Sequence, residues 1–169
     1  MKHTAQVTED VLQALIAKYR NKFVTRFPKL QLTVHFTPNG QPPTPEEVRT
    51  TPETREVSGL FAKVGRDYRI GINQNSPLHI KLLTFFHEYG HAIYRRQANE
   101  AIDNTDALIR TETEALLSSL RLSDEEGLPD IAYLAVNAAR VAALTDPVYQ
   151  TAMENATTDP LWQKYSKQN

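Results

Sequence analysis

At residues 85–91 the chain reads Phe-Phe-His-Glu-Tyr-Gly-His, which contains the pattern H-E-x-x-H. Residues four apart lie on one face of a helix, with Cβ atoms about 6 Å apart, so the imidazoles of His87 and His91 can reach one cation. Glu88 follows the first of them and would stand beside that cation, where it can take a proton from water. The pattern therefore predicts a helix-borne zinc site with Glu88 as general base.

The residues around the motif predict the helix that it requires. Ser76 is a natural N-cap and Pro77 a natural first helical residue. Gly90 is unusual inside a helix, where glycine costs about 1 kcal/mol relative to alanine. We therefore expect a strand or loop to pack tightly against that turn. Apolar side chains recur at the helical spacing of three to four, at Leu78, Leu82, Leu83, Phe86 and Ile93.

The third metal ligand has to come from elsewhere in the chain. Catalytic zinc sites use three protein ligands and keep the fourth position for water. The sequence has no cysteine, and no histidine follows His91, so we expect a carboxylate from a second helix within residues 106–122. Helical geometry favours Glu112 over Glu114, because Glu112 shares the face that is expected to turn inward. That face also carries Leu108, Ala115, Leu116, Ser119 and Leu120. The face of Glu114 is expected to be solvated, together with Arg110, Thr111, Ser118 and Arg121.

The rest of the chain predicts one small α+β domain over residues 1–169, a length sufficient for a single core. We expect a helix that starts at Thr8 and a strand at Leu30–Phe36 within residues 1–37. Residues 38–55 form a proline-rich loop, which is either a functional flap or a disordered insertion. A catalytic core then covers residues 56–122, and helices fill residues 123–169.

A β-hairpin is expected directly before the motif helix. Residues 57–64 and 68–73 read as its strands, joined by Gly65-Arg66-Asp67. The second strand, at residues 70–73, is the candidate for an open edge on which an extended peptide could add as a strand. The expected sheet is therefore small and antiparallel or mixed.

Charge and composition exclude several classes of function. A net charge of −1 gives no long-range attraction to nucleic acid or to acidic membranes. The N-terminal residues lack an apolar signal core, and no apolar stretch is long enough to span a bilayer. With no cysteine in the chain, we expect a cytoplasmic protein that binds neither nucleic acid nor membrane.

Several blocks, in the right order within residues 56–122, resemble the ImmA/IrrE family of metallopeptidases. They are Ser58-Gly59, Ile70-Gly71-Ile72-Asn73, Lys81, Thr84-Phe85, the motif at 87–91, and E-x-x-A at 112–115. The resemblance implies a zincin-like minimal metallopeptidase of the gluzincin type, with Zn²⁺ held by His87, His91 and Glu112. It also implies a protein substrate, such as a transcriptional repressor or another regulator. The family usually carries Asn or Asp just after E-x-x-A, where this chain has Leu116. Leu116 cannot orient the first histidine, so either another group holds the His87 ring or the ring is held less firmly.

The expected activity is that of a zinc metallopeptidase, with Glu88 as the catalytic base and a tyrosine that stabilises the oxyanion. Tyr94 is the first candidate for that tyrosine and Tyr133 the second. The alternatives are a zinc-containing regulator that binds a partner without cutting it, a toxin or effector protease, and a DNA-binding stress regulator. The intact Glu88 disfavours the first and the near-neutral charge disfavours the last.

Overall fold

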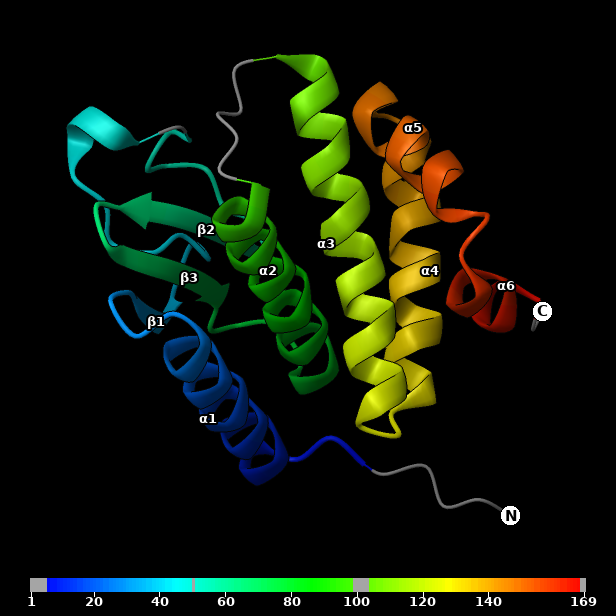
Figure 1. The fold of residues 1–169 in the computed structure, drawn as a ribbon, viewed down its shortest axis with the longest axis horizontal. Helices are drawn as coiled ribbons and strands as arrows, with labels where there is room; N and C mark the ends of the chain where they lie inside the picture. Colours follow the sequence, from blue (N-terminus) through cyan, green and yellow to red (C-terminus); the bar gives the residue numbers. More distant parts are fainter. Residues whose placement is uncertain (1–5, 50, 99–103, 168–169) are drawn as a thin grey trace. The chain divides into compact units, whose positions relative to one another are not determined.

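The computed structural model describes residues 6–49, 51–98 and 104–167 (Figure 1). In these ranges the chain forms six α-helices, one short 3-10 helix and one three-stranded mixed sheet. The predicted α+β class is therefore confirmed. The chain divides into two compact units, Val7–Glu88 and the part from Tyr89 onward, and the division falls inside one helix.

The first unit contains the whole sheet. Its elements are α1 (Glu9–Arg26), β1 (Gln31–Thr37), η1 (Glu46–Val48), β2 (Gly59–Val64), β3 (Asp67–Asn73) and the first half of α2 (Leu78–Ala98). Helix α1 begins as predicted, because the Thr8 hydroxyl accepts a hydrogen bond from the backbone N–H of Val11 at 3.3 Å.

The sheet has the strand order β1-β3-β2, with β1 parallel and β2 antiparallel to β3. The hairpin of β2 and β3 is confirmed, with a two-residue turn in which Gly65 has a φ of 61°. The predicted open edge at residues 70–73 is wrong, because β1 pairs with β3 along its full length. The edge strand of this hairpin is β2.

The core of this unit joins the sheet to both of its helices. Tyr68, Ile70 and Ile72 alternate along β3 and are at most 2% exposed, so one face of the strand is buried. The ring of Tyr19 on α1 packs edge-on against Phe86 on α2, with centroids 5.8 Å apart. These contacts fix the first half of α2 against α1.

Hydrogen bonds anchor the described part of the proline-rich loop. Gln41 is 7% exposed, and its side-chain amide donates to the carbonyl oxygens of Pro52 at 2.8 Å and Arg55 at 2.6 Å. The loop also crosses β3 closely, since a Cβ on Gly71 would stand 2.4 Å from the Pro42 nitrogen. A disordered insertion is therefore the wrong reading, and a gating role stays a prediction.

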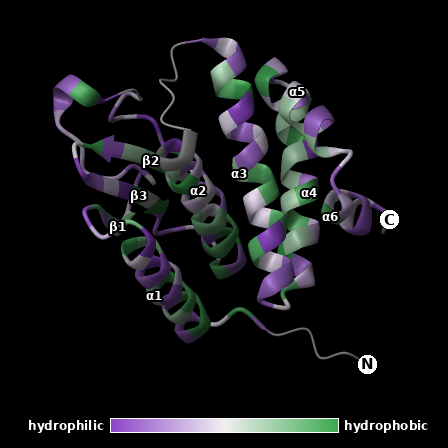
Figure 2. Ribbon diagram, viewed as in Figure 1, coloured by the Kyte–Doolittle hydropathy of each residue, from purple (hydrophilic) through white to green (hydrophobic). Residues whose placement is uncertain are grey.

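The second unit is helical. It contains the end of α2, then α3 (Thr105–Glu125), α4 (Pro129–Ala143), α5 (Pro147–Ala156) and α6 (Pro160–Ser166). Helices α3, α4 and α5 pack on one another, and Figure 2 shows α4 green or pale along most of its length. Trp162 and Tyr165 are about 95% buried and hold α6 in place. No helix in the described ranges is both long and apolar enough to cross a bilayer.

Candidate metal centre

Helix α2 carries the two motif histidines on one face. The helix is continuous from Leu78 to Ala98, so the position of His87 relative to His91 depends on its regular geometry alone. Phe85 and Phe86, just before the first histidine, are fully buried and pack against Tyr19. Burial of this apolar side sets the rotation of the helix and so fixes where its polar side lies.

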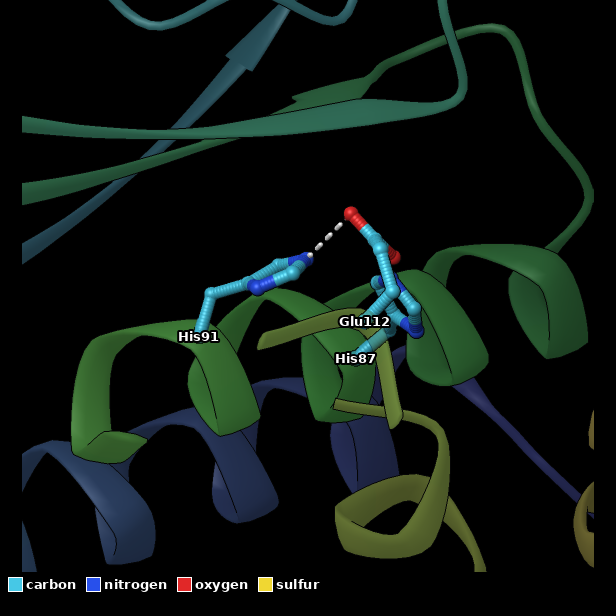
Figure 3. A group of neighbouring side chains, drawn as sticks. All are labelled: His87, His91 and Glu112. Atoms are coloured by element: carbon cyan, nitrogen blue, oxygen red, sulfur yellow. Dashed lines mark ion pairs between the residues drawn. The ribbon is translucent and has the colours of Figure 1, made fainter. Parts of the chain in front are cut away.

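Two imidazoles and one carboxylate meet at this helix. The ligand atoms of His87, His91 and Glu112 all lie within 4.8 Å of one another (Figure 3). Nε2 of His91 is 3.4 Å from Oε1 of Glu112, and the two side chains are only 12% and 11% exposed. Nitrogen and carboxylate donors at this spacing form a group that can hold a metal ion, and such a mixed set suits zinc better than calcium or magnesium.

Of the two candidate glutamates, only Glu112 belongs to this group of described residues. Glu114 is 42% exposed and lies 3.4 Å from Arg121, as expected for a solvated helix charge. The prediction for Thr111 is wrong, because this residue is only 1% exposed. Leu108 is expected to face inward but is 36% exposed, so the buried stripe of α3 is rotated toward Thr111.

Thr111 is the site residue that sequence reasoning missed. Its hydroxyl oxygen lies 3.0 Å from Nδ1 of His91, the ring nitrogen on the side away from Glu112. A signal was present in the sequence, since Thr111 lies four residues, about one helical turn, from both Ala107 and Ala115, which are also buried.

Gly90 is packed against helix α3. A Cβ at this position would lie 2.6 Å from Cβ of Ser118 and 2.9 Å from Cα of Ala115. Both distances are shorter than the contacts that Cβ atoms make in proteins. Tight packing at this turn is therefore confirmed, but the neighbour is a helix and not a strand or loop. The missing side chain lets α3 come close enough for Glu112 to reach His91.

The expected base, Glu88, lies against the start of the edge strand. It is 8% exposed, and a Cβ on Gly59 would lie 3.6 Å from its Cγ. The same Cβ would stand 2.2 Å from Cγ2 of Thr84, one turn earlier on α2. Because Gly59 has no side chain, β2 and the first half of α2 can pack closely beside Glu88.

The two tyrosines proposed for the oxyanion are placed differently. Tyr94 lies on α2, two turns after His87, and is partly buried. The ring of Tyr133 packs edge-on against Tyr165, with centroids 5.1 Å apart, which holds it in the contact between α4 and α6. The catalytic role of either tyrosine stays a prediction.

Comparisons with protein-family models, with curated proteins and with solved structures find no match to this chain. The resemblance to the ImmA/IrrE family therefore stays a prediction, and the chemistry of the site is inferred from its residues.

Proposed function

We propose that this protein is a zinc-dependent endopeptidase that cuts a protein substrate. The observation that carries the proposal is the convergence of the ligand atoms of His87 and His91, on α2, and of Glu112, on α3, within 4.8 Å of one another. Glu88 directly follows the first histidine on α2. This ligand set is that of catalytic zinc, with one position left for water. A purely structural zinc site has four protein ligands and needs no base.

Glu88 is the residue that moves protons in this proposal. Zinc bound to the three ligands would supply Lewis acidity toward water and the scissile carbonyl. Glu88 removes a proton from the attacking water as the new C–O bond forms, and then delivers it to the amine nitrogen as the peptide C–N bond breaks. Its carboxylate is largely shielded from solvent, which strengthens its interactions with charges nearby.

The edge of β2 offers a place for an extended substrate. Among the described residues, β2 pairs only with β3. The carbonyl of Ser58 accepts from the N–H of Asn73, so by the antiparallel alternation Gly59 and Phe61 direct their backbone groups away from β3. A peptide added along this edge would pass the side chain of Glu88, which contacts the Gly59 position. By its resemblance to the ImmA/IrrE family, the chain would cut a transcriptional repressor or another regulator.

Zinc binding and peptide cleavage, measured side by side, test the proposal. Zinc-loaded wild type, Glu88→Gln and the matched control Glu114→Gln are incubated with a library of short peptides, and new termini are identified by mass spectrometry. We expect cleavage by the wild type and the control, and none by Glu88→Gln despite unchanged zinc content. Cleavage by Glu88→Gln at the wild-type rate would refute the role of Glu88, and a zinc-loaded wild type that cuts nothing would favour a partner-binding protein.

A further inference from the structure

The two ring nitrogens of His91 face two consecutive residues of helix α3. Nε2 lies 3.4 Å from Oε1 of Glu112, whereas Nδ1 lies 3.0 Å from the hydroxyl oxygen of Thr111. Both partners belong to the same compact unit as His91, and Thr111 is 1% exposed. The ring is therefore held from both sides in a place that water hardly reaches.

The positions of these two partners determine which tautomer of His91 can bind a metal. A metal takes the lone pair of a neutral imidazole nitrogen, and the other nitrogen then carries the hydrogen. Since Nε2 is the nitrogen on the Glu112 side, Nδ1 must carry the hydrogen and donate it to the Thr111 hydroxyl oxygen. A hydroxyl can also donate, so the same contact persists when Nε2–H faces Glu112 and no metal is bound.

The hydroxyl of Thr111 has a different kind of partner from that of Thr113 on the same helix. The hydroxyl of Thr113 donates to the carbonyl oxygen of Ile109 at 2.8 Å, which is the usual bond of a helical threonine to the preceding turn. Thr111 instead contacts a side chain on another helix. Thr113 therefore offers a matched control, since it lies on the same helix and has the same chemistry.

We infer that Thr111 is a positioning residue for the metal site: its hydroxyl holds the His91 ring in the orientation that a zinc ion on Nε2 requires, and it accepts the Nδ1 hydrogen of the tautomer that binds the metal. The inference rests on the proposed zinc site. It assigns the outer hydrogen-bond partner of one histidine to a neutral hydroxyl, where a carboxylate or a backbone carbonyl is the more common partner. Removal of the hydroxyl lets the buried ring turn and leaves the Nδ1 hydrogen without this acceptor, which lowers zinc affinity.

Zinc affinity of the full chain, measured by competition with a chromophoric chelator, tests this inference. Thr111→Val removes the hydroxyl at nearly constant volume, and Thr111→Ser keeps it. We expect the dissociation constant to rise about 10- to 100-fold in Thr111→Val, the usual effect of losing such a partner. Thr111→Ser and the control Thr113→Val should remain close to wild type.

The tautomer of His91 and a second variant complete the test. Side-chain nitrogen NMR of the zinc-loaded wild type should show the hydrogen of His91 on Nδ1, because only that tautomer leaves Nε2 for the metal. If the valine variant does not fold, the zinc affinity of Thr111→Ala is measured in its place, and the same rise in dissociation constant is expected. Wild-type affinity in Thr111→Val or Thr111→Ala would overturn the inference and leave the zinc site standing, whereas a wild type that binds no zinc would overturn both.

Discussion

Replacement of Gly90 by alanine tests the close packing that brings the metal ligands together. The new Cβ would lie 2.6 Å from Cβ of Ser118 and 2.9 Å from Cα of Ala115. Carbon atoms in good contact are at least about 3.5 Å apart, so these two contacts must lengthen by at least roughly 0.6–0.9 Å. The Cα of Ala115 belongs to the backbone, and a change of rotamer cannot relieve that contact.

The expected free-energy change is the difference between two opposing effects. Overpacking costs about 1–3 kcal/mol, whereas alanine is favoured over glycine inside a helix by about 1 kcal/mol. We therefore expect Gly90→Ala to lower the free energy of unfolding by up to about 2 kcal/mol. The loss of zinc affinity should be clearer, because metal–ligand distances tolerate only about 0.2 Å of change, less than the required movement of Glu112 away from His91.

Chemical denaturation of the metal-free protein gives the free energy of unfolding, and competition with a chelator gives the zinc affinity. Ser118→Gly in the Gly90→Ala background removes one of the two close contacts and should restore part of both losses, which a double-mutant cycle will show. An alanine variant that is about 1 kcal/mol more stable than wild type, with unchanged zinc affinity, would refute the reasoning, because that is the result for a glycine with open space around it.

Three other perturbations have defined outcomes. Glu112→Gln should lower the affinity for zinc at least about tenfold, whereas Glu114→Gln should bind zinc as the wild type does. Metal titrations that show equal affinities for the two variants would exclude Glu112 as a ligand. Gly59→Ala should unfold at lower denaturant concentration, because its Cβ meets the carbonyl oxygen of Gly71 at 2.8 Å; an unchanged midpoint would contradict this. Hydrogen bonds from Lys164 and Tyr165 lower the pKa of Asp124 below its ordinary value of 3.8, so their stabilisation is present above about pH 4 and is lost as the pH falls through the lowered pKa. Asp124→Asn should thus be less stable at pH 7 and show a weaker loss of stability in acid, and a denaturation series identical to that of wild type would rule this out.

The local features of the fold were readable from the sequence. The Thr8 cap, the hairpin around Gly65 and the helix that carries the motif all depend on neighbouring residues, and the structure contains each of them. The convergence of His87 and His91 is likewise a property of one helix.

The features that were missed depend on contacts between distant segments. Nothing local in residues 70–73 shows that β1 pairs with them, so the sequence predicts an edge where the structure has the central strand. The size of Leu108 suggests that its face turns inward, but close packing at Gly90 turns the smaller residues of α3 inward instead. The same rotation buries Thr111, which contacts His91. Helix rotation is set by what packs against the helix, which a wheel of one helix does not contain.

X-ray absorption at the zinc edge, on protein purified with zinc, is the most direct test of the proposed site. The account predicts one zinc ion per chain with nitrogen and oxygen ligands at about 2.0–2.2 Å, including imidazole scattering from two histidines, and loss of this signal in Glu112→Gln. A chain that holds no zinc, or a zinc signal that survives in a His87→Ala, His91→Ala double variant, would contradict it.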